Sequence, residues 1–158
     1  MIYGYCMGGA MGVAMACDLR FAAEGSKFGI PAARLSIIYP PDAIGQLVDL
    51  VGPAYAKDIL FSARTVSDRE ALAIGFIQRL VPAGDLEQAT HDYLATLADN
   101  APLSVRQAKK SIRYGMQTDL LTGYRFEIEA YNRLVDTEDR REGVRAFNEK
   151  RKPTFQGR

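Results

Sequence analysis

Hydrophobic residues follow two different spacings along the chain, and the change between them falls near residue 85. Before this point, short apolar runs of strand length alternate with segments of helical length. The strand-like runs are residues 2–6, 19–23, 28–30, 37–39 and 76–81. After it, apolar side chains recur every three or four positions, which is typical of amphipathic helices. The pattern predicts an α/β part, residues 1–84, followed by a helical part, residues 85–158.

Residues that start and stop helices punctuate this pattern. Asp42 is suited to cap a helix that Gly52 closes, and Pro53 suits the first turn of the helix that follows. The segment from Ser67 to residue 70 matches a capping box, in which a serine hydroxyl and a glutamate carboxylate satisfy each other's neighbouring amides. We expect the last helix to begin near Thr137 and to run to about residue 150.

One predicted helix carries an apolar stripe, formed by Leu121, Tyr124, Ile128, Tyr131 and Val135. Such a stripe needs a partner surface. Packing within the chain is the preferred interpretation, and contact with another copy of the chain is compatible with it.

Charge and residue content limit the classes of function. Twenty basic and nineteen acidic residues leave a formal charge of +1, so no overall field favours nucleic acid or a membrane surface. Cys6 and Cys17 lie in an apolar stretch without metal-ligand spacing, which predicts buried free thiols in a reducing, cytoplasmic compartment. His91 is the only histidine, and its neighbours predict a solvated helix face. No metal site is therefore expected.

The apolar beginning of the chain, residues 1–17, is predicted to be buried in protein. It ends at Asp18, short of the ~20 residues that a membrane-spanning helix needs, and no basic region precedes it as in a secretory signal. Residues 1–6 are typical of a buried strand, whereas a natural N-terminus is usually exposed and polar. We therefore expect Met1 to lie inside a fold that has an earlier part.

The segment from Gly4 to Arg20 resembles the enoyl-CoA hydratase/isomerase (crotonase) family. Further matches follow in the family's order at residues 28–31, 50–53, 71–77, 100–103, 141–147 and 149–153. The resemblance implies the C-terminal portion of a crotonase-like fold, in which part of a ββα spiral is followed by a helical trimerisation region. It also implies upstream spiral turns that supply a second amide to an oxyanion hole.

The resemblance further implies a protein that processes acyl-CoA thioesters and assembles as a trimer or a dimer of trimers. Coenzyme A is then part of the substrate, and no separate cofactor is needed. In the family's reactions an enolate forms, and backbone N–H groups stabilise the negative charge on its thioester oxygen. Gly9 corresponds to a glycine that supplies one such group, with Gly8 before it. Alternatively, both glycines only permit a tight turn from strand to helix.

The two glutamates that the family's hydratases use for proton transfer correspond to Gly12 and Ala32, so the usual hydration mechanism is not expected. Tyr39 corresponds to a tyrosine that faces the acyl group in a related methylmalonyl-CoA decarboxylase, although it can equally be a packed aromatic side chain. Asp42 lies near an acidic residue of dienoyl-CoA isomerases but out of register with it, so a helix cap is its preferred interpretation.

Two residues of the helical part correspond to family residues that approach the nucleotide of coenzyme A from a neighbouring subunit. These are Lys150, since a lysine suits a phosphate, and the aromatic Tyr131. Alternatively, Lys150 belongs to a charged surface run and Tyr131 to the apolar stripe. Three hypotheses remain: an acyl-CoA-processing enzyme with altered acid–base residues, an acyl-CoA decarboxylase, and a truncated, non-catalytic chain that keeps only its oligomerisation surfaces.

Overall fold

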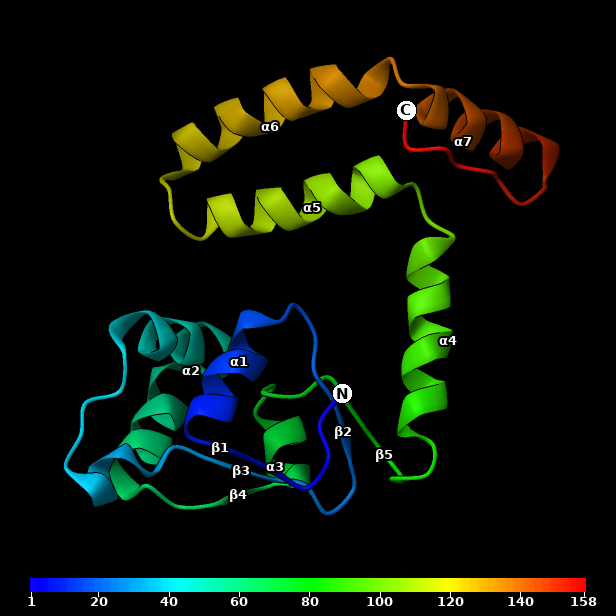
Figure 1. The fold of residues 1–158 in the computed structure, drawn as a ribbon. Coiled ribbons are helices and arrows are strands. Elements are labelled where there is room, and N and C mark those ends of the chain that lie inside the picture. The colour runs from blue at the N-terminus through cyan, green and yellow to red at the C-terminus, as the bar shows by residue number, and fades with distance from the viewer. The chain divides into compact units, whose positions relative to one another are not determined.

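The structure is a computed structural model that describes residues 1–158, with seven α-helices and five short β-strands. These residues form two compact units, Met1–His91 and Asp92–Arg158 (Figure 1). All five strands lie in the first unit. The predicted change from mixed α/β structure to helices alone is therefore confirmed.

The strands of the first unit build two small sheets. The strands are β1 (Tyr5–Met7), β2 (Phe21–Ala23), β3 (Lys27–Gly29), β4 (Val66–Ser67) and β5 (Arg79–Val81). β1 and β3 pair in parallel, with Cys6 opposite Phe28, and β4 joins β3 in antiparallel orientation. β2 and β5 pair in parallel, with Ala22 opposite Leu80. Because parallel strands need a crossover connection, the chain leaves β1 through helix α1 (Gly9–Ala16) before it returns to β3.

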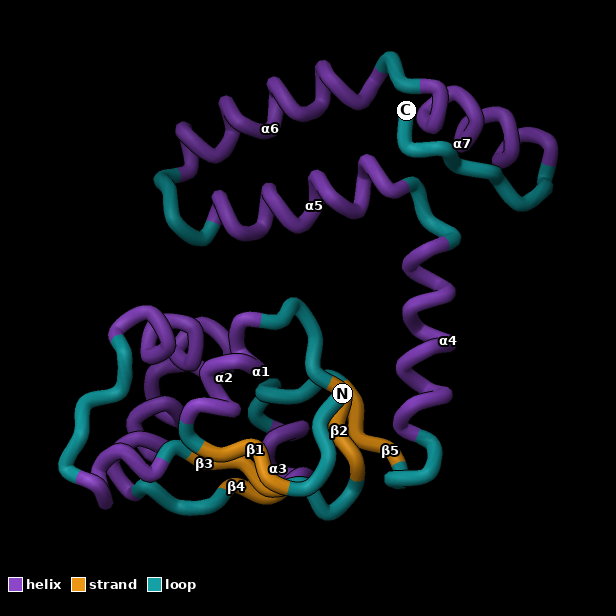
Figure 2. The backbone as a smooth tube through the Cα atoms, viewed as in Figure 1, coloured by secondary structure: helices purple, strands orange, loops and turns teal.

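Helices α1, α2 (Pro41–Ser62) and α3 (Asp68–Ala73) bury the apolar side chains of the first unit. α1 and α2 lie on the same side of β1 and β3 (Figure 2), and α1 packs against both α2 and β1. Large core side chains include Met11, Phe28, Leu47 and Phe76. Phe28 and Phe76 meet edge to face with ring centroids 5.4 Å apart, an arrangement that aromatic pairs favour.

The predicted helix signals are confirmed at two places. Gly52 interrupts α2 with a φ of 77°, a left-handed value that favours glycine, and Pro53 follows it. Ser67 caps α3, because its hydroxyl oxygen accepts a hydrogen bond from the N–H of Glu70 at 3.2 Å. The Glu70 carboxylate also binds the guanidinium of Arg64.

Arg20 is a buried cation held by backbone carbonyl groups. Its side chain donates to the carbonyl oxygens of Phe76 at 2.6 Å, Ala14 at 3.2 Å and Cys17 at 2.8 Å, and the residue is 3% exposed. Ala14 and Cys17 lie at the C-terminal end of α1, where carbonyl groups lack helical partners and the helix dipole is negative. Arg20 therefore ties the end of α1 to the segment before β5.

The second unit is helical. It consists of the end of α4 (Leu86–Ala98), then α5 (Pro102–Gly115), α6 (Leu120–Val135) and α7 (Glu138–Glu149). α5 and α6 lie side by side as an antiparallel hairpin, with the rings of Tyr114 and Phe126 stacked at 4.4 Å. The predicted limits of the last helix are confirmed, since the Thr137 hydroxyl caps α7 by accepting from the N–H of Arg140 at 3.2 Å. None of the seven helices is long and apolar enough to cross a membrane.

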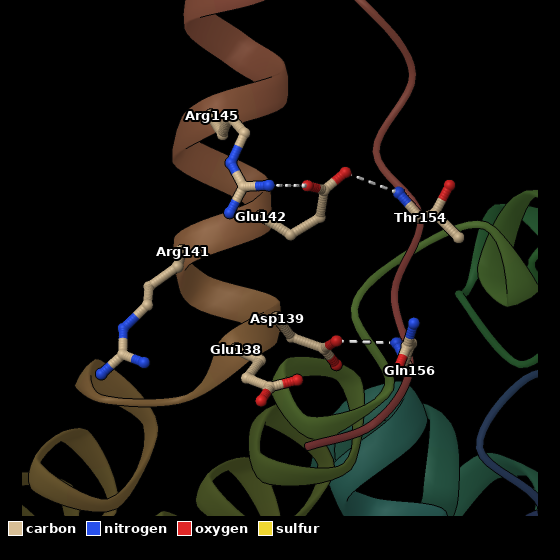
Figure 3. Close-up of a pocket in the computed structure, with 7 residues that line it drawn as sticks. All are labelled: Glu138, Asp139, Arg141, Glu142, Arg145, Thr154 and Gln156. Atoms are coloured by element: carbon tan, nitrogen blue, oxygen red, sulfur yellow. Dashed lines mark hydrogen bonds and ion pairs between the residues drawn. The ribbon is translucent and has the colours of Figure 1, made fainter.

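The last residues of the chain run back along α7 and are held by two acidic side chains (Figure 3). Asp139 is 4% exposed, and its carboxylate accepts from the backbone N–H groups of residues 156 and 157 at 2.7 and 2.8 Å. Glu142, one turn later on the same helix, accepts from the N–H of Thr154 at 3.1 Å. We call residues 151–158 the C-terminal strap.

Two local predictions before α2 are wrong. Residues 37–39 form no strand: a 3-10 turn over Pro31–Leu35 ends at Ser36, whose φ of 54° redirects the chain, and Ile38 is 91% exposed. Asp42 is not a helix cap, because α2 already begins at Pro41 and proline suits the first helical position. Asp42 instead lies exposed in the first turn of α2.

Three burial predictions are also wrong. At the start of the chain, Met1, Tyr3 and Tyr5 are exposed, and of residues 1–6 only Cys6 is buried, whereas Met11, Ala14 and Met15 on α1 are buried as predicted. Cys17 is exposed after the end of α1. On α6, the Phe126 ring faces α5 and Ala130 is buried, but neither residue belongs to the predicted apolar stripe. The first four residues of that stripe are exposed: Leu121, Tyr124, Ile128 and Tyr131.

Replacing Arg20 by methionine tests how much the buried guanidinium contributes to stability. Arg20→Met keeps apolar bulk but leaves the carbonyl groups of Phe76, Ala14 and Cys17 without this donor. We expect the free energy of unfolding to fall by about 3 kcal/mol, measured by urea denaturation followed by circular dichroism. The exposed Arg69 on α3 supplies the control, since Arg69→Met is expected to change stability by less than about 0.5 kcal/mol. Equal effects of the two substitutions would contradict the assignment.

Candidate functional site

A tight turn joins β1 to α1 and places two glycines at the start of the helix. Gly8 precedes the helix with φ 52° and ψ −115°, a backbone conformation that favours glycine. Its N–H donates to the carbonyl oxygen of Gly29 at 2.8 Å, which fixes the turn to β3. Gly9 is the first residue of α1 and is exposed.

The N–H group of Gly9 has no hydrogen-bond acceptor within the chain. It belongs to the N–H groups that every α-helix leaves unpaired at its N-terminus, where the helix dipole gives a positive potential. A Cβ atom on Gly9 would meet no other atom within 4 Å, so the space beside this residue is open. An unpaired donor beside open space is chemically suited to a negatively charged oxygen.

Tyr39 closes one side of this turn from a loop far along the chain. Its hydroxyl donates to the carbonyl oxygen of Gly8 at 3.0 Å. Burial raises the pKa of Tyr39, and the negative charge of Asp42 raises this pKa further. The Gly12 amide acts in the opposite direction and lowers it. The hydroxyl therefore keeps its proton, and remains a donor, at neutral pH.

The positions that resemble those of the family's glutamates carry no carboxylate. Gly12 lies on the first turn of α1, and a Cβ atom there would be 3.3 Å from the Tyr39 hydroxyl oxygen. Ala32 is buried within the 3-10 turn over Pro31–Leu35. The structure thus brings Gly8, Gly9, Gly12 and Tyr39 together without an acidic side chain from position 12 or 32.

The two residues that resemble coenzyme A contacts, Tyr131 and Lys150, lie in the second unit. Tyr131 is 66% exposed on α6. Lys150 follows α7 in the left-handed conformation, with a φ of 54°, and its exposed side chain makes no ion pair. Both side chains are therefore accessible in this chain, and their roles stay predictions.

The residue after Lys150 fixes the beginning of the C-terminal strap. Arg151 forms two hydrogen bonds with the Glu142 carboxylate, at 2.6 and 3.0 Å. This pairing, followed by the hydrogen bond from the Thr154 amide, lowers the pKa of Glu142 to about 2. The chain direction after α7 is thereby set by an ion pair next to Lys150.

Sequence reasoning did not find two features of these sites. It proposed Tyr39 for the acyl pocket but did not find its hydrogen bond to the Gly8 carbonyl, because the two residues are 31 positions apart and no periodicity relates them. It did not find the strap contacts of Asp139 and Glu142 either. The available signal was weak: both acidic residues lie on one side of a helix, followed by a polar tail.

Comparison with known proteins agrees with this geometry. The sequence matches the Enoyl-CoA hydratase/isomerase family over residues 1–158. A solved enoyl-CoA hydratase from Bacillus anthracis superimposes with a TM-score of 0.94 and 37% sequence identity, covering 98% of this chain and 60% of that chain. The strands, the turn at Gly8 and the helices that follow therefore form part of a crotonase fold. The chain belongs to the enoyl-CoA hydratase/isomerase family.

Named relatives include two hydratases. The short-chain-enoyl-CoA hydratase of Clostridium acetobutylicum is 35% identical over 151 residues, which cover 96% of this chain and 58% of that protein. The mitochondrial methylglutaconyl-CoA hydratase of Rattus norvegicus is 36% identical over 160 residues, which cover 99% of this chain and 51% of that protein. The chain therefore spans between 51% and 58% of the length of these relatives.

The low pKa of Glu142 makes the C-terminal strap sensitive to acid. Because the pKa falls from 4.5 to about 2 in the folded chain, the contact with Arg151 is fully stabilising above about pH 4.5 and is lost as the pH falls through about 2. We expect the Thr154 amide signal in NMR spectra to titrate with a midpoint near pH 2. Glu142→Gln should abolish this titration, and Glu87→Gln, on the exposed face of α4, should not. A midpoint near pH 4.5 would contradict the pairing.

Proposed function

We propose that the chain is the part of an acyl-CoA-processing protein that donates the Gly9 N–H to the thioester oxygen of the substrate. The observation that carries the proposal is the unpaired N–H of Gly9 at the start of α1, which lies beside open space and belongs to the same peptide as the fully bonded Gly8 carbonyl. Membership of the family supports acyl-CoA thioesters as the substrate class.

The chemistry follows from where charge develops. When a bond to the carbon next to the thioester breaks, its electron pair delocalises onto the thioester oxygen and forms an enolate. A backbone N–H held in place beforehand stabilises this oxygen, and one such donor contributes about 3–4 kcal/mol. The dipole of α1 acts in the same direction. The resemblance to the family implies that a second N–H donor comes from an upstream loop.

Hydration by the family's usual route is not expected, because Gly12 and Ala32 cannot position water or transfer protons. A second candidate is therefore decarboxylation, which the lack of a carboxylate at positions 12 and 32 favours. Loss of carbon dioxide leaves its bonding electrons on the neighbouring carbon, so the enolate forms without a protein base. Water then supplies the proton that completes the product.

Two residues of the second unit extend the proposal to the rest of the substrate. The exposed ammonium group of Lys150 is suited to a phosphate of coenzyme A, and the exposed ring of Tyr131 to its adenine. As in the family, these contacts would reach a neighbouring copy in a trimer or a dimer of trimers. We further propose that the protein acts in the cytoplasm and needs no cofactor besides the coenzyme A of its substrate.

Acetoacetyl-CoA tests the donor role of Gly9, because its enolate absorbs in the near ultraviolet and stabilisation of the enolate raises this absorbance. Gly9→Pro removes the N–H at the first helical position, where proline is tolerated, whereas Gly9→Ala keeps the N–H and adds a Cβ in open space. We expect the proline variant to lower the bound enolate fraction by about 10²-fold to 10³-fold. The alanine variant should retain it.

The remaining outcomes separate the alternatives. Equal loss in both variants would contradict a role for the Gly9 N–H. Release of carbon dioxide from methylmalonyl-CoA would support decarboxylation, and rapid hydration of crotonyl-CoA would overturn the argument from Gly12 and Ala32. An intact oligomer that binds no acyl-CoA would instead support a non-catalytic chain.

The apolar stripe on α6 tests the proposed assembly. Ile128→Glu places a negative charge between the exposed side chains of Tyr124 and Tyr131. If this surface is buried between two copies of the chain, the unpaired charge makes their association unfavourable. We expect this variant to dissociate, as measured by size-exclusion chromatography with light scattering. Glu129→Gln, the neighbouring exposed position on α6, serves as the control and should leave the mass unchanged. An unchanged oligomer in Ile128→Glu would exclude this surface as the interface.

A further inference from the structure

The peptide unit between Gly8 and Gly9 is held at its carbonyl end only. In a trans peptide the C=O and N–H groups point in opposite directions, so the Gly8 carbonyl and the Gly9 N–H are the two ends of one dipole. The carbonyl oxygen accepts from the Tyr39 hydroxyl at 3.0 Å and from the N–H groups of Met11 and Gly12 at 3.0 and 3.4 Å. The N–H end has no partner in the chain.

We propose that Tyr39 is a positioning residue for the Gly9 N–H. Its hydrogen bond to the Gly8 carbonyl fixes the orientation of the shared peptide and polarises the N–H toward a thioester oxygen. The inference rests on the proposed function of Gly9, and it assigns Tyr39 a role through the backbone of the turn.

The conformation of Gly8 explains why such a tether is needed. Glycine has the widest choice of backbone angles, so the Gly8 residue itself does not fix the peptide that follows it, and hydrogen bonds have to do so. The donors from Met11 and Gly12 belong to the helix itself, whereas the Tyr39 hydroxyl comes from a separate loop and holds the carbonyl from outside the helix. A hydrogen bond at the carbonyl end of a peptide also strengthens its N–H as a donor.

The proton of Tyr39 is already committed to the backbone. A phenol has one O–H donor, and here it is directed at the Gly8 carbonyl oxygen at 3.0 Å. Donation of this proton to an acyl group would break the tether. The position of the Tyr39 hydroxyl therefore favours a role in orienting the Gly9 N–H over direct contact with the substrate.

The free chain provides the first test. Tyr39→Phe removes the donor and keeps the ring, and the Gly9 amide proton should then move to lower chemical shift in NMR spectra. Gly12→Ala perturbs the same hydrogen bond independently, since its Cβ would crowd the hydroxyl oxygen at 3.3 Å while alanine favours the helix. The control is Tyr55→Phe, which removes an exposed hydroxyl of α2 and should leave the Gly9 signal unchanged. An unmoved Gly9 signal in both site variants would overturn the proposal.

Bound acetoacetyl-CoA provides the second test. Tyr39→Phe should lower the enolate fraction about threefold to tenfold, the range of one neutral hydrogen bond, while affinity for coenzyme A itself stays unchanged. If the unmodified chain raises no enolate signal, the proposed function fails, and the Gly9 chemical shift still reports on the tether. If the unmodified chain raises the signal and Tyr39→Phe raises it equally, the positioning role is refuted and the proposed function stands.

Discussion

The carbonyl oxygen of Gly8 accepts three hydrogen bonds, and this crowded acceptor organises the turn on which the candidate site depends. The helix contributes two of the donors, and Tyr39 contributes the third from the loop that leads into α2. On the other side of the same residue, the Gly8 N–H is fixed to β3 through Gly29. The sheet, α1 and the loop before α2 therefore converge on one glycine, whose left-handed backbone permits the turn.

Features that depend on neighbouring residues were predictable from the sequence. The apolar spacing after residue 85 predicted the helices of the second unit, including the start of the last helix near Thr137, because each helix side chain reports on positions three or four residues away. Gly52 followed by Pro53 likewise predicted the interruption of α2. The glycines at the start of α1 were predicted as a site from a resemblance, since spacing alone cannot separate a tight turn from an oxyanion donor.

Features that depend on distant residues were not predictable. Ile37 and Ile38 have strand-forming side chains, yet no neighbouring strand pairs with them, and Ser36 has already turned the chain away. The stripe on α6 has helical spacing, but periodicity does not reveal which face meets α5, and the ring that stacks on α5 is that of Phe126, outside the stripe. Burial and pairing are set by tertiary contacts, and these override local propensity.

The absence of a carboxylate at position 12 and the tether from Tyr39 are two aspects of one arrangement. Any side chain at position 12 begins with a Cβ atom 3.3 Å from the Tyr39 hydroxyl oxygen, so a glutamate there would crowd the hydroxyl that binds Gly8. Glycine at this position removes a proton-transfer group and at the same time leaves room for a fixed donor on the Gly8 carbonyl. In the function that we propose, an oriented Gly9 N–H acts without an acid–base group at position 12, and this combination suits a reaction in which the substrate itself delivers the enolate.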